Sequence, residues 1–260
     1  MGESNQLSLA GVYRRRIGAS LARIWENVFD WEHLPALHAS SFEDVRLVSH
    51  VGDEQVVEID NAAGHTTTIR TVGRRGEHRY VVHTTEGKGT GSEVRVKLTP
   101  VEAHLTDIEV QYHVPEHRPE RLKAIGEAFV PFYARLWDED EVMMRARETR
   151  LRARRGRPVA EAVKLGAVEA VEGALPLTVE LGGEPFRLIR DGGELIAHAA
   201  VCPHFLGPLD ETPVADGVVR CPWHGWRFDV RTGAEVQGRP CRLPSPPRVS
   251  VEAGEVWLRP

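Results

Sequence analysis

The sequence predicts an α+β protein of two domains, and three observations support this fold class. Runs in which apolar and polar residues alternate recur between residues 11 and 113, as in a sheet with one buried face. A long stretch of helical periodicity follows these runs. The remainder of the chain consists of short strand-like runs rich in glycine and proline. We therefore expect an antiparallel sheet wrapped on a long helix, followed by a small all-β domain.

The first domain is expected over residues 8–155, and it opens with a strand over 11–18. A helix then begins at Ala19-Ser20 and ends near Pro35, because proline disfavours the interior of a helix. Six strand-like runs, most of them separated by glycine-containing turns, cover residues 44–50, 54–60, 65–72, 78–85, 92–99 and 105–113.

A long helix is predicted from His117 to about Arg155, where apolar residues recur at helical spacings. These residues are Leu122, Ile125, Phe129, Phe132, Tyr133, Leu136, Met143 and Met144. An arginine-rich linker around 152–166 leads to the second domain, expected over 166–260. Its first strand-like runs cover residues 167–173, 175–183, 184–193 and 194–201.

The composition argues against several classes of function. A formal net charge of −5 disfavours general affinity for nucleic acid or anionic membranes. No apolar run approaches the roughly 20 residues of a membrane span. The N-terminus lacks the apolar core and cleavage site of a secretory signal, so we expect a cytoplasmic protein. No glycine-rich dinucleotide fingerprint is present, so NAD(P)H or flavin chemistry is expected in a partner.

Two cysteines and two histidines form the most specific motif of the chain. Cys202-Pro203-His204 is separated by sixteen residues from Cys221-Pro222-Trp223-His224. Paired Cys/His loops of this kind suit either a Rieske-type [2Fe–2S] cluster or a tetrahedral zinc ion. The third cysteine, Cys241, is left over, which argues against a disulfide framework. We expect Cys241 to be a structural thiol.

The surroundings of this motif resemble Rieske ferredoxin-like domains across residues 166–260. The resemblance includes Gly207-Pro208-Leu209 after the first loop, the HGWRFD run at 224–229 and the proline-rich stretch 243–247. It implies a [2Fe–2S] cluster with thiolates on one iron and imidazoles on the other. The implied ligands are Cys202, His204, Cys221 and His224.

The Rieske proteins of respiratory complexes have extra loop cysteines that form a disulfide, and a serine after the second loop's HG. Here neither loop has a third cysteine, and Trp226 follows Gly225. Fewer hydrogen bonds to the cluster sulfurs lower the reduction potential. We therefore expect the ferredoxin or oxygenase type, which passes electrons to another site.

A second candidate site lies in the helix of the first domain, where Asp30, His33 and His38 form the pattern D-x2-H-x4-H. This pattern, with Glu26-Asn27 before it, resembles the catalytic iron motif of Rieske non-haem iron oxygenases. The resemblance implies that His33 and His38 are iron ligands and that Asp30 is the carboxylate linking the two metal centres. Residues five apart on a straight helix point about 140° apart, so Pro35 is expected to bend the chain between the histidines.

A 2-His-1-carboxylate site needs a third ligand, and the long helix offers four consecutive acids at 138–141. Asp140 follows Leu136 by four residues and precedes Met143 by three, which places it in the apolar stripe. A carboxylate there is costly unless it is paired or binds a metal. The pair Glu139-Asp140 also resembles an acidic pair on the last catalytic helix of Rieske oxygenases. We expect Asp140 to be the third ligand, with Glu141 as the alternative.

These resemblances imply an oxygenase that uses O2 and a mononuclear Fe(II) to hydroxylate or demethylate an apolar or aromatic substrate. Electrons would come from an NAD(P)H-dependent reductase or a ferredoxin. The domain order is the reverse of that in the familiar oxygenases. Both their head-to-tail homotrimer and an electron path within one chain therefore stay open.

The first domain also resembles START/polyketide-cyclase-like helix-grip domains, which often carry a DWE-x-LP segment, here residues 30–35, without a metal. The alternative is therefore a non-enzymatic Rieske electron carrier fused to a START-like domain that binds a small molecule. Iron content separates the two hypotheses, with about three irons per chain for the oxygenase and about two for the carrier.

Overall fold

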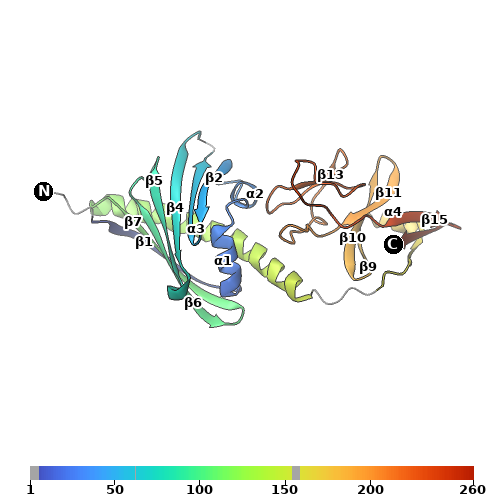
Figure 1. Cartoon of the computed structure of the whole chain (residues 1–260), viewed down its shortest axis with the longest axis horizontal. Helices are drawn as coiled ribbons and strands as arrows, with labels where there is room; N and C mark the ends of the chain where they lie inside the picture. The colour runs from blue at the N-terminus through green and yellow to red at the C-terminus, as the bar shows by residue number, and fades with distance from the viewer. Residues whose placement is uncertain (1–5, 62, 154–158) are drawn as a thin grey trace. The chain divides into compact units, whose positions relative to one another are not determined.

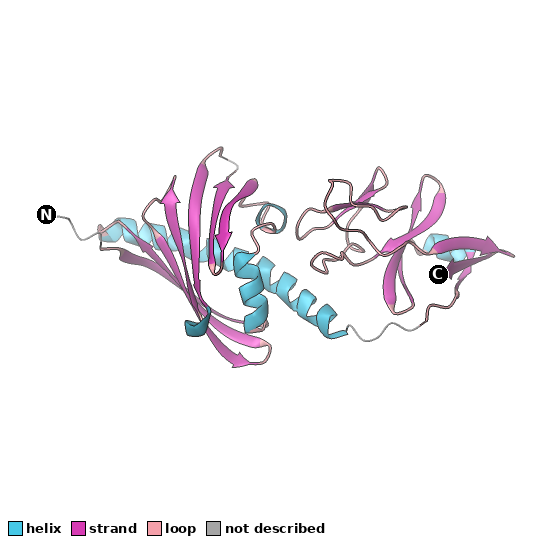
Figure 2. Cartoon of the chain, in the orientation of Figure 1, coloured by secondary structure: helices cyan, strands magenta, loops and turns pink. Residues whose placement is uncertain are grey.

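The protein is described by a computed structural model that covers residues 6–61, 63–153 and 159–260. The chain divides into two compact units, Met1–Glu148 and Thr149–Pro260. Figure 1 shows both units coloured along the chain, and Figure 2 distinguishes their helices from their strands. The two units are described separately below.

The first unit is built on a seven-stranded antiparallel sheet with the strand order β1-β7-β6-β5-β4-β3-β2. Strands β2 to β7 form a meander, and β1 closes the sheet by pairing with β7. The strands are β1 (Ser8–Ile17), β2 (Asp44–Val51), β3 (Glu54–Asp60), β4 (Thr66–Arg74), β5 (Arg79–Glu86), β6 (Glu93–Glu102) and β7 (Leu105–Val114), with a 3-10 turn, η1 (Arg75–Glu77), before β5. All seven predicted strands are present.

Three helices accompany the sheet: α1 (Leu21–Phe29), α2 (Leu34–Leu37) and α3 (Pro119–Ala153). The prediction that the first helix continues to Pro35 is wrong, because α1 already ends at Phe29. Pro35 instead lies in the first turn of α2, where the missing N–H of proline costs nothing. The chain therefore bends before His33, and α2 is a separate short helix between His33 and His38.

The core of this unit lies between the sheet and two helices. Ile24 and Trp25 of α1 and Phe129, Trp137 and Met144 of α3 are buried. They pack in one cluster with buried sheet residues that include Val96, Leu98, Ile108 and Val110. Figure 2 shows the sheet curving around α3. This is the helix-grip arrangement of START-like domains, so the predicted fold class is confirmed.

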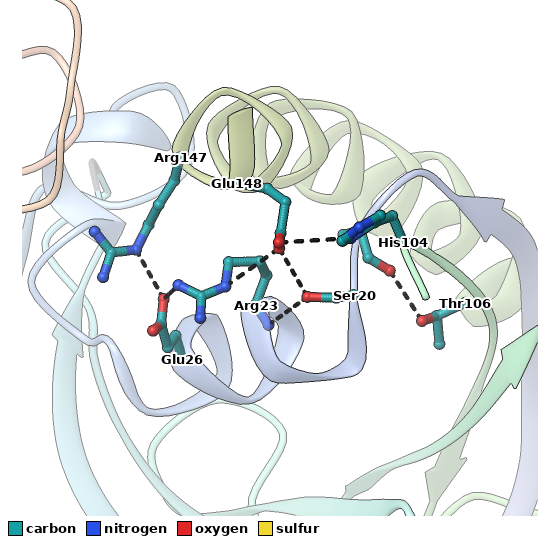
Figure 3. Close-up of polar contacts among 8 residues, drawn as sticks. Ser20, Arg23, Glu26, His104, Thr106, Arg147 and Glu148 are labelled. Carbon is teal, nitrogen blue, oxygen red and sulfur yellow. Dashed lines mark hydrogen bonds and ion pairs between the residues drawn. The ribbon is translucent and has the colours of Figure 1, made fainter. Parts of the chain in front are cut away.

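A polar network fixes α1 against the C-terminal part of α3 (Figure 3). The Ser20 hydroxyl donates to Glu148 Oε2 at 2.8 Å and also caps the first turn of α1. Arg23 Nε lies 3.4 Å from the same Glu148 oxygen, and Arg147 Nε donates to Glu26 Oε2 at 2.8 Å. Since α1 leads directly into the segment with His33 and His38, this network restrains that segment relative to α3.

The second unit contains three three-stranded sheets, ordered β11-β10-β9, β12-β13-β14 and β15-β16-β8. The strands are β8 (Val163–Ala167), β9 (Leu177–Leu181), β10 (Glu184–Asp191), β11 (Glu194–Ala199), β12 (Val214–Ala215), β13 (Val218–Arg220), β14 (Arg227–Asp229), β15 (Arg248–Glu252) and β16 (Glu255–Arg259). The sheets confirm the small all-β domain.

The strand predicted over 167–173 is wrong, because these residues form helix α4 (Val168–Gly173). Val168 and Val171 stand one helical turn apart, and Val171 is buried. Alanine and glutamate between them favour a helix over a strand. The three-residue spacing of the two valines therefore indicates the structure of this segment better than its short apolar run does.

No helix among the described residues is long and apolar enough to cross a membrane.

At Gly126 the backbone of α3 passes very close to that of β1. A Cβ atom at Gly126 would lie 2.1 Å from the carbonyl oxygen of Ala10, and its Cα already lies 3.2 Å from the Cβ position of Gly11. Ala10 sits at a register shift in the pairing of β1 with β7. Two backbones meet here, so neither can move aside as a side chain would.

We expect Gly126→Ala to lower the free energy of unfolding of the protein by about 1–3 kcal/mol, because overpacking against backbone forces α3 away from β1. Chemical denaturation followed by circular dichroism measures this change. Gly76→Ala is the matched control, because nothing lies within 4 Å of a Cβ at Gly76. Equal stability of the two variants would contradict the close approach.

Candidate metal centres

Two loops of the second unit present the Cys/His motif. Cys202 follows β11, and Cys221 lies between β13 and β14. Both cysteine side chains are fully buried, and neither is in a disulfide. The loops therefore bring two sulfur atoms together in the interior of a small β domain.

The two loops repeat the same backbone pattern. The amide of Cys202 donates to the carbonyl five residues later, at Gly207, and the amide of Cys221 donates in the same way to Trp226. The carbonyls of both cysteines accept from the amide four residues later, at Leu206 and Gly225. Those two residues have the same left-handed conformation, with φ of 66° and 69°. Each loop is thus a tight turn that folds back onto its cysteine.

The turns also direct backbone N–H groups at the sulfur atoms. The amides of His204 and Phe205 donate to Cys202, and those of Trp223 and His224 donate to Cys221. The hydrogen bond between the two thiols lowers the pKa of Cys221 to about 5 and raises the pKa of Cys202. The backbone N–H groups favour the thiolate at both sulfurs, and the thiolate is the form in which cysteine binds iron.

The histidine rings are held by aromatic residues of the opposite loop. The His204 ring stacks on Trp226 with 3.8 Å between centroids and 9° between planes. The His224 ring meets Phe205 edge to face at 5.0 Å. The two imidazoles lie 4.6 Å apart. Each loop thus packs the ligand histidine of the other, which fixes the orientation of both rings.

These residues fit a [2Fe–2S] cluster by their donor set and by the space they leave. A Cβ at Gly207 would lie 2.6 Å from the Sγ of Cys221, so only glycine leaves the sulfur room on this side. Two thiolates and two imidazoles are the donor set of a Rieske centre. Cys241 is partly buried elsewhere, and burial raises its pKa, as suits a structural thiol.

A second group of donors gathers in the first unit. One ligand atom each from His33, His38 and Asp140 lies within 4.8 Å of the other two. Asp140 Oδ1 is 3.4 Å from His33 Nε2 and 3.1 Å from His38 Nε2. The three residues are 3%, 1% and 7% exposed. They come from the two ends of α2 and from the middle of α3, and they form one buried cluster.

Each histidine of this cluster has a carboxylate on its other ring nitrogen. Asp30 Oδ2 lies 3.5 Å from His33 Nδ1, and Glu139 Oε2 lies 2.5 Å from His38 Nδ1. Burial lowers the pKa of His38, but the hydrogen bonds and charges of Asp140 and Glu139 outweigh it and raise the pKa above its usual value. The cluster therefore carries a strong excess of negative potential around two imidazoles.

Sequence reasoning did not anticipate the contact of Glu139, and it left Glu141 open as a ligand. Glu141 faces β1, where it accepts from the Gly18 amide at 2.8 Å and pairs with Arg15 at 2.6 Å. The structure thus brings Asp140, and not Glu141, to the histidines. Two tyrosines near Asp140, Tyr80 and Tyr133, were also not anticipated as neighbours. In the sequence these tyrosines cannot be told apart from other residues of the apolar core, in which both of them pack.

Comparisons with known proteins agree with the Cys/His site described for the second unit. Residues 161–247 match the Rieske [2Fe-2S] domain family. The ferredoxin subunit of anthranilate 1,2-dioxygenase from Burkholderia cepacia is 38% identical over 76 residues, which are 29% of this chain and 70% of that subunit. Apoptosis-inducing factor 3 of Mus musculus is 41% identical over 66 residues, which are 25% of this chain. The match spans only 11% of the length of that relative.

Among solved structures, the first unit is similar to the ZhuI aromatase/cyclase from Streptomyces sp. R1128. The match covers 55% of this chain and 96% of that one, with 14% identity and a TM-score of 0.45.

The Cys/His loops, the sheet arrangement and the sequence matches define the class of the second unit as a Rieske-type iron–sulfur domain. The chain belongs to the Rieske [2Fe-2S] family, and its Rieske domain follows a START-like helix-grip domain. The similarity to ferredoxin subunits supports an electron-carrier role for the Rieske domain, and it favours a [2Fe–2S] cluster over zinc.

We expect Gly207→Ala to reduce the amount of [2Fe–2S] cluster in the protein severalfold, because its Cβ would occupy space beside Cys221. Acid-labile sulfide and visible absorption measure the cluster content. Gly173→Ala in α4 is the control, because a Cβ there meets nothing within 4 Å. Full cluster content in Gly207→Ala would contradict the tight fit.

Proposed function

We propose that the chain is a Rieske-type non-haem iron oxygenase, in which the helix-grip domain binds a mononuclear Fe(II) through His33, His38 and Asp140. The convergence of these three buried donors carries the proposal. Two histidines and one carboxylate with open positions are the donor set of non-haem iron oxygenases. A Rieske domain in the same chain supplies the electron carrier that such chemistry needs.

Charge balance supports a cation in this cluster. Asp30, Glu139 and Asp140 place three carboxylates around two imidazoles that are almost fully buried. Burying carboxylates without a compensating positive charge is costly. A divalent metal ion held by His33, His38 and Asp140 would supply that charge in place of the proton that these carboxylates favour on His38.

When bound in such a site, ferrous iron supplies the one-electron chemistry by which O2 oxidises an organic substrate. The residues of this chain hold the ligands in place. Asp30 Oδ2 lies 3.5 Å from His33 Nδ1, where its charge would favour a ring orientation that leaves Nε2 for the metal. By resemblance to the oxygenases, Asp30 is also the carboxylate through which electrons from a Rieske centre enter. A separate reductase or ferredoxin would reduce that centre.

The surroundings of the cluster favour a neutral, apolar or aromatic substrate. The Phe42 ring lies edge to face with His38 at 6.1 Å, and Phe132 lies 6.4 Å beyond Phe42. Burial, reinforced by the nearby Asp140, raises the pKa of Tyr80 and Tyr133, so both phenols stay protonated. The same low-dielectric surroundings disfavour a substrate that brings another negative charge.

A second candidate function is an electron carrier fused to a domain that binds a small molecule. The observation that favours it is the kind of relative matched by the Rieske domain. Ferredoxin CarAc of Metapseudomonas resinovorans, like the anthranilate dioxygenase subunit, is named as a ferredoxin. In that case His33, His38 and Asp140 would bind no iron.

Iron content distinguishes the two functions. We expect anaerobically reconstituted protein to hold about three irons and two acid-labile sulfides per chain, and His33→Ala to hold about two irons with the same sulfide. His65→Ala, which changes an exposed histidine of the same domain, serves as the control and should keep about three irons. Two irons in the unaltered protein, unchanged by His33→Ala, would reject the oxygenase.

Asp30→Asn tests the electron route separately from metal binding. We expect this variant to keep the third iron and a reducible cluster, but to oxidise substrate about 10- to 100-fold more slowly, because the amide lacks the negative charge next to His33. A single-turnover reaction of the chemically reduced protein with O2 and a panel of aromatic and terpenoid compounds measures the rate. If the variant oxidises substrate at the rate of the unaltered protein, Asp30 does not carry the electrons to the iron.

A further inference from the structure

The four consecutive acids at 138–141 divide into two pairs that contact different partners, although they are neighbours on one helix. Asp138 is largely exposed and pairs with Arg15 of β1. Glu141 pairs with the same arginine at 2.6 Å. Both therefore attach α3 to β1. Glu139 and Asp140 point instead to the other side, where His38 lies between them.

His38 contacts these two carboxylates through different ring nitrogens. Its Nδ1 is 2.5 Å from Glu139 Oε2, and its Nε2 is 3.1 Å from Asp140 Oδ1. A neutral imidazole has one N–H and one lone pair. An ionised carboxylate only accepts, so both contacts favour a proton on the ring, and a His38 that carries one proton keeps it on Nδ1, where the contact is the shorter of the two. The lone pair of this neutral ring is then on Nε2, which faces Asp140 and His33.

We propose that Glu139 is a positioning residue of the iron site: it fixes the tautomer and ring orientation of His38 so that Nε2 is presented to the metal. This inference rests on the proposed function, since it concerns the same site. Asp30 lies at the corresponding nitrogen of His33 without the short hydrogen bond, so each histidine has a carboxylate near its Nδ1 but only the Glu139 contact is close. The contact of Glu139 is the shorter by 1.0 Å, the difference between 3.5 and 2.5 Å.

The geometry explains why Glu139 has this role and its neighbours do not. Residues 139 and 140 are adjacent on α3, so their side chains diverge by about 100°. One imidazole fits into the angle between them and contacts both carboxylates. His38 is 1% exposed, whereas the Glu139 side chain is 32% exposed. The outer carboxylate therefore stays partly hydrated, which limits the desolvation cost of its charge.

Two variants of Glu139 test this role against a purely structural one. We expect Glu139→Ala to weaken Fe(II) binding at the mononuclear site about 10- to 100-fold, as is usual when an outer-shell partner of a metal ligand is lost. Glu139→Gln should recover most of the affinity, because its amide oxygen still accepts from Nδ1. Glu139→Leu, which keeps the bulk of the side chain, should behave like Glu139→Ala.

Asp138→Asn is the matched control, because Asp138 is an acid of the same helical turn whose largely exposed side chain pairs with Arg15 and not with His38. It should bind Fe(II) within about twofold of the unaltered protein, since surface ion pairs contribute little. Three measurements compare the variants. They are anaerobic Fe(II) titration of protein with an intact cluster, the visible spectrum of Co(II) bound at the mononuclear site, and the melting temperature of the protein without metal at that site.

The outcomes separate the inference from the proposed function. Weakened Fe(II) binding and an altered Co(II) spectrum in Glu139→Ala, with an unchanged melting temperature, support the positioning role. Unchanged affinity and spectrum in Glu139→Ala and Glu139→Leu overturn it while leaving the iron site in place. If the unaltered protein binds no third iron, the proposed function and this inference both fail.

Discussion

The burial of the Asp140 carboxylate beside two imidazoles is the constraint on which the helix-grip domain depends. Asp140 lies within the apolar stripe of α3, next to Trp137 and Met143 in the core, and is 7% exposed. A carboxylate in that position destabilises the fold unless positive charge or hydrogen bonds compensate it. The break between α1 and α2 meets this need, because it turns the chain so that both histidines face α3. The network of Ser20, Arg23 and Glu148 then keeps α1 in register with α3 (Figure 3).

The Rieske domain also buries polar ligands, and it does so with two loops of the same backbone structure. Two turns with the same hydrogen-bond pattern bring two sulfurs together and surround them with backbone N–H groups. The second turn uses Gly225 at its left-handed position, whereas the first uses Leu206, which adopts that conformation at a cost. Leu206 is almost fully buried, so its packing offsets part of the strain. The crossed aromatic contacts of Trp226 and Phe205 then link the two turns.

The relatives matched by the Rieske domain include proteins named as ferredoxin subunits, whereas here the ferredoxin-type domain shares a chain with a helix-grip domain. Under the proposed function, this fusion joins an electron carrier to the domain that uses its electrons. A covalent connection raises the effective concentration of one domain at the other. Under the same proposal, both centres follow one physical rule, in which charged or polar ligands are buried and their orientation is set by neighbours that do not bind the metal.

The sequence by itself determined the elements with strong periodicity and the motifs with fixed spacing. Strands β1 to β7, helix α3, the inward face of Asp140 and the two Cys/His loops all depend on local patterns of residues. The sequence misplaced the end of α1 and the fold of residues 167–173, where short apolar spacings suit more than one structure. Only the tertiary structure decided that Glu139 contacts His38 while Glu141 contacts Arg15. Adjacent acids on a helix are alike in sequence, and what distinguishes them is which partner the packing of α2 and β1 places within reach of each side chain.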